Sequence, residues 1–345
     1  MLVLGIETSC DETAVALLEL QPRPLKFKLL ENLIASQHDV HTPYGGIVPE
    51  LASRRHIEVL PALVKEATKK VGLKNISGIA VTSSPGLVGS LLVGVSFAKA
   101  LAFARKIPFI GVNHLEGHLN APCLIEPNKI RYPQIALIVS GGHTALLRVK
   151  KFGDYKFLGG THDDAAGEAF DKAAKILGLG YPGGPVVDKR AQLGDPSSIV
   201  LPKPKVAEFG FSFSGLKTAI RVEAERRKPL NEQTIANFCA SFQEVVVDNL
   251  IEKTLAAAGK FRCKTIVVTG GVACNSRLRK QFAKVAKAKK LQVFFPTPIM
   301  STDNAAMIAY VGGRYLLAGK RSPLSLNATA NVDLTRMGIA LEPRR

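Results

Sequence analysis

The residues best suited to chemistry lie in the run HLEGH, where His114 and His118 stand four residues apart. On a helix these two histidines share one face, so both imidazoles can reach a single metal ion. Zinc proteases of the H-E-x-x-H or H-x-x-E-H type carry a glutamate next to a histidine, whereas Glu116 lies at the centre of this run. The spacing therefore favours a metal site, or a pair of unrelated histidines, over a zinc protease.

A third metal ligand is available in the stretch STDNAAMIA, which places Asp303 in a loop before a helix. Two histidines and one carboxylate leave coordination positions open, an arrangement suited to iron(II) or zinc. The alternative is that Asp303 only caps the helix that follows it.

Two glycine pairs follow apolar runs, in IVSGGHT (138–144) and VVTGGVACNSR (267–277). Glycine lets the backbone approach a ligand closely, and consecutive backbone N–H groups can cradle an anion. The second pair also leads into the N-terminus of a helix, which favours negative charge. Neither run matches the P-loop or the dinucleotide fingerprint. One such turn is readily structural, but two in corresponding positions favour a nucleotide site.

Acidic residues gather in the segment 161–191 of an otherwise basic chain. We expect Asp163 and Asp164 to cap a helix that begins near residue 165. Asp171 is expected at the rim of a pocket, close to the glycines of YPGGP (181–185). A carboxylate near such glycines suits the hydroxyl groups of a ribose.

The elements that must position these residues alternate between strands and helices, which predicts an α/β protein. Each half has an apolar strand that ends in a Gly, Ser or Thr cluster. We therefore expect two related lobes facing each other across a central cleft: an N-terminal lobe, 1–132, joined by a C-terminal helix at about 304–330, and a C-terminal lobe, 133–303. The expected strands are 2–8, 78–84, 108–112, 134–149 (a hairpin hinged at Gly141 and Gly142) and 264–273, and the expected helices are 52–71, 87–104, 165–178, 234–258, 276–290 and 304–319.

The charge balance indicates a polyanionic partner, because 46 basic and 28 acidic residues give a net charge of +18. Simple solubility is the alternative. The segment 276–290 has seven basic residues and no acidic one, and helical spacing gives it a basic stripe. Five scattered cysteines without a C-x-x-C pair argue against a disulfide framework and fit the cytoplasm. We expect neither a membrane span nor a secretory signal.

Taken together, the motifs closely resemble those of the tRNA N6-adenosine threonylcarbamoyltransferase family, once described as O-sialoglycoprotein endopeptidases, and in particular its bacterial branch. They occur in order along nearly the whole chain. The matching runs are LGIETSCDET (4–13), YGGIVPELASRRH (44–56), SPGLVGSLLVG (84–94), VNHLEGHLNAP (112–122), LIVSGGHT (137–144), DDAAGEAFDKAAKILGLGYPGGP (163–185), FSFSGLKT (211–218), GGVACNSRLR (270–279) and STDNAAMIAY (301–310).

This resemblance implies a two-lobed fold of the actin, Hsp70 and sugar-kinase type. It implies transfer of a threonylcarbamoyl group from threonylcarbamoyl-AMP to N6 of the adenosine beside the anticodon, in tRNAs that read codons beginning with adenine. One metal ion, iron(II) or alternatively zinc, would be held by His114, His118 and Asp303. The adenylate-binding positions would be Ile138, Val139, Ser140, Gly141, Gly142, Asp171, Gly184, Asp188 and Asn275.

The resemblance further implies helper proteins, a related inactive subunit and a small ATPase, besides the tRNA and threonylcarbamoyl-AMP. Asp11 and Glu12, just past the first expected strand, are our candidates for catalytic acid–base residues, with capping of the next turn as the alternative. The rival functions are an ATPase or kinase of the same fold, a metalloprotease, and a non-catalytic scaffold. The histidine pair argues against the first, and the position of Glu116 argues against the second.

Overall fold

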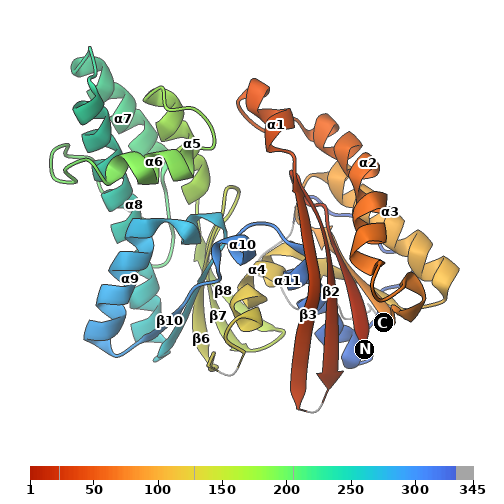
Figure 1. Cartoon of the computed structure of the whole chain (residues 1–345). Helices are drawn as coiled ribbons and strands as arrows, with labels where there is room; N and C mark the ends of the chain where they lie inside the picture. The colour runs from red at the N-terminus through yellow and green to blue at the C-terminus, as the bar shows by residue number, and fades with distance from the viewer. Residues whose placement is uncertain (23, 128, 205, 332–345) are drawn as a thin grey trace. The chain divides into compact units, whose positions relative to one another are not determined.

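The computed structural model describes residues 1–22, 24–127, 129–204 and 206–331 (Figure 1). The chain forms two compact units. Among the described residues, unit 1 contains Met1–Ile125 together with residues 302–331, and unit 2 lies within Glu126–Ser301.

Unit 1 is a five-stranded sheet with helices on both faces. Its elements, with η marking a 3₁₀-helix, are β1 (Leu2–Glu7), β2 (Glu12–Pro22), β3 (Leu25–Ser36), α1 (His38–His41), η1 (Thr42–Tyr44), α2 (Pro49–Thr68), η2 (Leu73–Asn75), β4 (Gly78–Ser84), α3 (Val88–Arg105), β5 (Phe109–Asn113), α4 (His114–Asn120), η3 (Ala121–Leu124) and α11 (Ala305–Leu317).

Unit 2 is likewise a five-stranded sheet, with a larger set of helices. Its elements are β6 (Gln134–Val139), β7 (Thr144–Lys151), β8 (Asp154–Gly160), α5 (Ala166–Ile176), α6 (Gly183–Ala191), α7 (Ser214–Arg226), α8 (Glu232–Lys260), β9 (Thr265–Thr269), η4 (Gly271–Cys274), α9 (Ser276–Lys289), β10 (Gln292–Phe294) and α10 (Pro298–Ser301).

The two sheets have the same topology. Unit 1 has the strand order β3-β2-β1-β4-β5, and unit 2 has β8-β7-β6-β9-β10 when its sheet is read in the same direction. In each, the first three strands form an antiparallel meander. The last two strands then run parallel to the first. The predicted α/β class and hairpin are confirmed, but β2, β3, β8 and β10 are absent from the sequence prediction.

Opposite faces of the unit 1 sheet are covered by segments far apart in the chain. Leu4 and Ile6 of β1 belong to one buried cluster with Leu60 of α2 and Val95 of α3. Gly5 faces α11 instead, where a Cβ atom on Gly5 would lie 2.4 Å from the carbonyl oxygen of Ala305. The absence of a side chain at this position therefore lets α11 pack directly on the strand backbone.

Helix α3 is long and apolar enough to cross a membrane, judged by length and composition alone. Core helices of soluble proteins pass the same test. Leu91, Val95 and Ala98 of α3 are fully or almost fully buried, and the helix packs beside α2 along the sheet (Figure 1).

The core of unit 2 lies between its sheet and its helices. Ile135, Leu137 and Val139 alternate along β6 and share one buried cluster with Phe170 of α5 and Phe242 of α8. This alternation is the period-two pattern of a strand with one face on a core.

Candidate metal centre and glycine turns

Helix α4 brings the two histidines of HLEGH together. It begins directly after β5, and the side chain of Asn113 caps it by accepting hydrogen bonds from the backbone N–H groups of Leu115 (2.8 Å) and Glu116 (3.1 Å). His114 and His118 are both buried, with ring centroids 4.6 Å apart and the ring planes perpendicular. The helical spacing expected from the sequence is confirmed.

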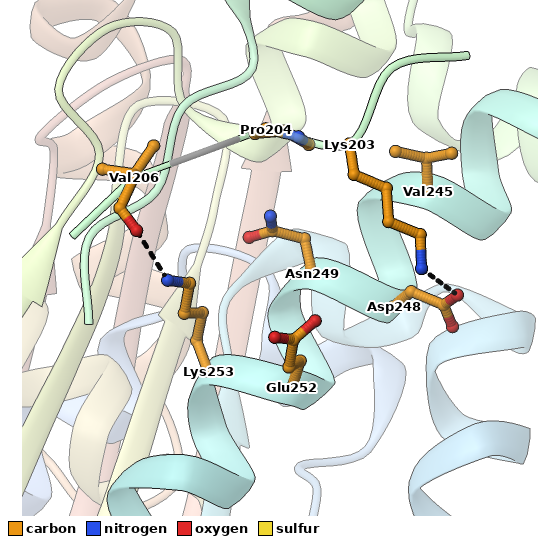
Figure 2. Close-up of a pocket in the computed structure, with 8 residues that line it drawn as sticks. All are labelled: Lys203, Pro204, Val206, Val245, Asp248, Asn249, Glu252 and Lys253. Carbon is orange, nitrogen blue, oxygen red and sulfur yellow. Dashed lines mark hydrogen bonds and ion pairs between the residues drawn. The ribbon is translucent and has the colours of Figure 1, made fainter. Parts of the chain in front are cut away.

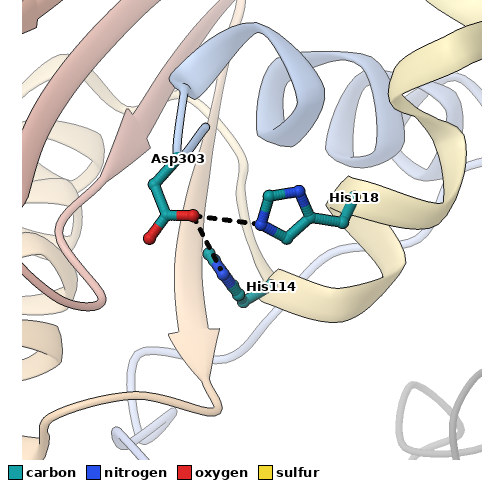
Figure 3. Close-up of side chains that lie close together, drawn as sticks. All are labelled: His114, His118 and Asp303. Atoms are coloured by element: carbon teal, nitrogen blue, oxygen red, sulfur yellow. Dashed lines mark hydrogen bonds and ion pairs between the residues drawn. The ribbon is translucent and has the colours of Figure 1, made fainter. Parts of the chain in front are cut away.

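Asp303 faces both histidines (Figure 3). Its Oδ1 atom lies 3.0 Å from Nε2 of His118 and 3.4 Å from Nε2 of His114. One ligand atom from each of the three residues lies within 4.8 Å of the others, so the group could hold a metal ion. Asp303 does not cap α11, because the cap is Asn304, whose side chain accepts a hydrogen bond from the Met307 N–H (3.1 Å).

Glu116 is not one of the three residues that could hold the metal ion. It is buried, and the hydroxyl of Tyr315 in α11 donates a hydrogen bond to its Oε1 atom (2.6 Å). Burial, reinforced by the Glu116 carboxylate, raises the pKa of Tyr315 well above its usual range. The glutamate therefore joins α4 to α11 and is not aimed at the histidines, as a zinc protease would require.

Behind His114 lies a buried carboxylate that the sequence analysis missed. Glu7, the last residue of β1, is fully buried, and its Oε2 atom lies 3.0 Å from Nδ1 of His114. Burial lowers the pKa of His114, but the carboxylates of Asp303 and Glu7 outweigh burial and raise it to about 9. The one signal in the sequence was an acidic residue closing the apolar run LVLGIE.

The candidate acid–base residues lie beside this cluster in the same unit. Glu12 is the first residue of β2, so it begins a strand rather than capping a turn. Burial, with further contributions from the carboxylates of Asp303 and Asp11, raises the pKa of Glu12 to about 10. His56 of α2 supports the preceding loop, because its Nε2 atom lies 3.0 Å from the backbone oxygen of Cys10.

In unit 2 the first glycine turn joins β6 to β7. Gly141 and Gly142 are exposed, and a Cβ atom on either would meet no atom within 4 Å. The turn is held at Ser140, whose backbone N–H donates to the oxygen of His143 (2.8 Å). Ile138 and Val139, also predicted to bind adenylate, are fully buried within β6, so the structure does not expose their side chains at the turn.

The second glycine turn adjoins the first, because β9 is the parallel neighbour of β6. Gly270 has φ of 96°, and a Cβ atom there would lie 2.4 Å from the oxygen of Val139. Asn275 follows and caps α9, with its Oδ1 atom accepting from the Leu278 N–H (2.9 Å). Its Nδ2 atom donates to Oε1 of Gln243 (2.7 Å).

The remaining predicted adenylate residues are Asp171 in α5 and Gly184 and Asp188 in α6, and the two acids contact the starts of α6 and α9. Asp171 accepts a hydrogen bond from the Gly183 N–H (2.7 Å), and burial raises its pKa. Asp188 accepts from the N–H (3.1 Å) and the hydroxyl (2.7 Å) of Ser276. Gly184 has open space beside its Cα atom. The acids thus fix two helix N-termini near the glycine turns.

Comparison with known sequences then decides the family. The sequence profile described as tRNA N6-adenosine threonylcarbamoyltransferase matches residues 28–310. A protein of that name from Geobacter sulfurreducens is 49% identical over 99% of this chain and 100% of its own length. Its counterpart from Syntrophus aciditrophicus is 50% identical over 98% of this chain and 99% of its own length. The chain belongs to the tRNA N6-adenosine threonylcarbamoyltransferase family.

Solved structures share the fold of this family member. HypF from T. kodakarensis aligns with a TM-score of 0.61 and 16% identity, covering 92% of this chain and 48% of that one. Component A of (R)-2-hydroxyglutaryl-CoA dehydratase from Acidaminococcus fermentans aligns with a TM-score of 0.52 and 15% identity, covering 92% and 98%. At these identities the likeness concerns the fold, and it confirms the actin/Hsp70/sugar-kinase class.

The predicted role of Asp163 and Asp164 is wrong for this family member. Asp163 accepts hydrogen bonds from the Phe213 N–H (2.8 Å) and the Ser214 hydroxyl (2.8 Å), so it holds the start of α7. Asp164 pairs with Lys172. The first N–H of α5 donates instead to the hydroxyl of Thr144 (2.8 Å).

The basic stripe on α9 is only partly available. Arg277 forms a bidentate ion pair with Glu244, in which its Nε and Nη2 atoms donate to the two carboxylate oxygens at 2.6 and 2.7 Å. Lys280, Lys284 and Lys287 are exposed. The outward surface of this helix is therefore a row of lysines.

A polar pocket of ≈460 Å³ lies elsewhere in unit 2 (Figure 2). Its two lysines are already engaged. Lys253 donates to the backbone oxygen of Val206 (2.9 Å), and Lys203 lies 4.0 Å from Asp248. The lining includes none of the predicted site residues, so we assign no role in the reaction to this pocket.

Proposed function

We propose that this chain transfers the threonylcarbamoyl group of threonylcarbamoyl-AMP to N6 of the adenosine beside the anticodon, in tRNAs that read codons beginning with adenine. The products are N6-threonylcarbamoyladenosine and AMP. Membership of the tRNA N6-adenosine threonylcarbamoyltransferase family supports this reaction. The observation that carries the proposed site is the convergence of His114, His118 and Asp303 on one point.

We propose iron(II), with zinc as the alternative, as the ion held by these residues. Two imidazole nitrogens and one carboxylate oxygen are donors that both ions accept, and three protein ligands leave positions open for substrate. The fit is supported by the close approach of the three ligand atoms, within 4.8 Å of one another. When bound, such an ion supplies Lewis-acid polarisation of a carbonyl oxygen.

The glycine turns of unit 2 are proposed to hold the AMP portion of the donor. The exposed backbone of Gly141 and Gly142, beside the half-buried Ser140, can approach a phosphate closely, and helix N-termini favour its negative charge. Ile138, Val139 and Gly184 would contribute backbone, and Asp171, Asp188 and Asn275 would contact the nucleoside or hold the helix starts that do. The contribution to rate is orientation of the leaving group.

Asp11 and Glu12 are proposed to take the proton that N6 loses as the new C–N bond forms. A carboxylate whose pKa is raised toward the working pH is a better proton acceptor than an ordinary one. Without an ion the pKa of Glu12 is about 10, so the group is protonated at neutral pH. A nearby cation would lower that pKa and leave the group ionised and able to accept the proton.

The partners proposed are tRNA, a related inactive subunit and a small ATPase, all in the cytoplasm. The exposed lysines of α9 suit contacts to the tRNA backbone, because phosphate contacts dominate nucleic-acid affinity.

The test is reconstitution with synthetic threonylcarbamoyl-AMP, unmodified tRNA and iron(II), followed by mass spectrometry of the nucleosides. We expect N6-threonylcarbamoyladenosine from the wild-type chain and a loss of at least about a hundredfold in His114→Ala and Asp303→Ala. His38→Ala, at an exposed histidine of α1, is the matched control. A second arm adds the two helper proteins.

Product from the two alanine variants at the control level would refute the proposed metal centre. No product in either arm, with folded protein, would refute the proposed reaction.

A further inference from the structure

Glu7 is the most completely enclosed acid near the proposed metal centre. It is 0% exposed, and each of its carboxylate oxygens has a partner. Oε1 accepts a hydrogen bond from the Ser9 N–H (2.6 Å), and Oε2 accepts one from the Thr82 hydroxyl (2.6 Å). Oε2 also lies 3.0 Å from Nδ1 of His114. These three contacts come from the β1 end, β4 and α4, so they fix the carboxylate from different directions.

The imidazole of His114 is thus placed between two carboxylates. Nδ1 faces Glu7 at 3.0 Å, and Nε2 faces Asp303 at 3.4 Å. A neutral imidazole carries its proton on one nitrogen and a lone pair on the other. A proton donated from Nδ1 to Glu7 leaves the Nε2 lone pair directed at the Asp303 side, where a metal ion would be bound.

Glu7 also changes the charge of the centre without using a coordination position. With neutral His114 and His118, the carboxylate of Asp303 alone would leave a divalent ion with a net charge of +1. The buried charge of Glu7 brings the sum to zero when the ion, its three protein ligands and Glu7 are counted, and Asp11 and Glu12 are not. Because burial makes an uncompensated charge costly, this second carboxylate favours the loaded state.

We propose that Glu7 is a positioning residue that holds the proton of His114 on Nδ1 and supplies the second negative charge of the metal centre. The inference rests on the proposed function, because it assumes an ion held by His114, His118 and Asp303. Histidine ligands of metals generally have such an outer partner, and its loss typically weakens metal affinity ~10- to 100-fold.

The substitution Glu7→Gln is informative because it preserves shape and removes charge. If the new amide nitrogen faces His114, it opposes a proton on Nδ1, which then either moves to Nε2, the nitrogen required for the metal, or keeps only the Ser9 hydroxyl (3.1 Å) as its acceptor. If the amide is turned the other way, its NH₂ group faces the Ser9 N–H, and two donors oppose each other. Either arrangement disfavours the ion.

Metal affinity is the readout, measured on the full-length chain by competition for Zn²⁺ with a chelator whose absorbance reports bound metal. We expect Glu7→Gln to bind Zn²⁺ ~10- to 100-fold more weakly than wild type. The matched control is Glu116→Gln, the same chemical change at a buried glutamate that contacts Tyr315. It should bind within about threefold of wild type, since the hydrogen bond that it weakens goes to Tyr315 of α11.

Two further measurements test the inference if Glu7→Gln fails to fold. Thr82→Val removes one donor to Glu7 and should weaken Zn²⁺ binding by a smaller factor. In the Zn²⁺-loaded wild type, nitrogen NMR of labelled histidine should show His114 with a proton on Nδ1 and the ion on Nε2.

The inference is overturned if Glu7→Gln binds Zn²⁺ as tightly as wild type, if Glu116→Gln loses as much affinity, or if the NMR places the ion on Nδ1 of His114. Failure of the wild-type chain to bind any metal would instead refute the proposed metal centre.

Discussion

Replacing Gly270 with alanine should damage unit 2 more than almost any other loss of a single glycine there. Gly270 has φ of 96°, a conformation that costs other residues about 1–3 kcal/mol. The added Cβ would lie 2.4 Å from the oxygen of Val139 and 2.7 Å from its carbonyl carbon, both backbone atoms of β6. Relief of such overpacking costs about 1–3 kcal/mol more. We therefore expect a loss of about 2–6 kcal/mol in the free energy of unfolding.

The neighbouring glycine supplies the control. Gly271 lies in η4, and a Cβ atom there would meet nothing within 4 Å. Gly271→Ala should change stability by less than about 0.5 kcal/mol.

Both variants can be compared by urea unfolding followed by circular dichroism, taking the midpoint and slope of each transition. The reasoning is refuted if Gly270→Ala is as stable as Gly271→Ala within about 1 kcal/mol. Such a result would mean that the β6 and β9 ends are not held as closely as the distances indicate.

Three further predictions concern single interactions. Asp163→Asn should cost about 0.5–1 kcal/mol at pH 7, because the carboxylate holds the start of α7. Partial burial raises the pKa of Asp163, but hydrogen bonds from Ser212, Phe213 and Ser214 outweigh it and lower the pKa. The stabilisation that the Asp163 carboxylate gives the folded state is therefore fully present above the unfolded pKa of ~3.9, and it is lost as pH falls through the folded pKa. Unfolding titrations at pH 7 and pH 3 should show a smaller wild-type advantage at pH 3 than at pH 7. Asn304→Ala removes the cap of α11 and should cost about 0.5–2 kcal/mol, seen in thermal melts, and should also weaken Zn²⁺ binding because Asp303 precedes it. Replacing Lys284 and Lys287 with glutamine should flatten the salt dependence of tRNA binding by a slope of about 2, measured by filter binding, and an unchanged slope would exclude α9 from the phosphate contacts.

The sequence predicts elements well where hydrophobic runs are long. The expected strand 78–84 matches β4, and the expected helix 87–104 is shifted by one residue from α3. Strands β2 and β3 were not predicted because neither shows the alternating pattern of a half-buried strand. β2 is buried continuously over Thr13–Leu18, and β3 is half-buried along most of its length. The residues just after β1, Asp11 and Glu12, were interpreted only as candidate site residues, although Glu12 begins β2.

The candidate site was predictable where the ligands are close in sequence. The four-residue spacing of His114 and His118 could be interpreted without a structure, whereas the residues alone left Asp303 open between a third ligand and a helix cap, and the resemblance favoured the ligand. Glu7 could not be found because its role depends on the order of β1, β4 and β5 in the sheet. Asp163 was assigned to the wrong helix because its partners lie 50 residues further along the chain.

The order in which a ribosome makes this chain has a consequence for the ion. His118 and Asp303 are 185 residues apart, and all of unit 2 lies between them. At about 5–20 residues per second, roughly ten to forty seconds pass between the emergence of α4 and that of the third ligand. During that interval the face of β1 that α11 will cover is bare. Unit 2, second in the nascent chain, can therefore finish folding first, and capture of the proposed ion would be one of the last events in the protein's maturation.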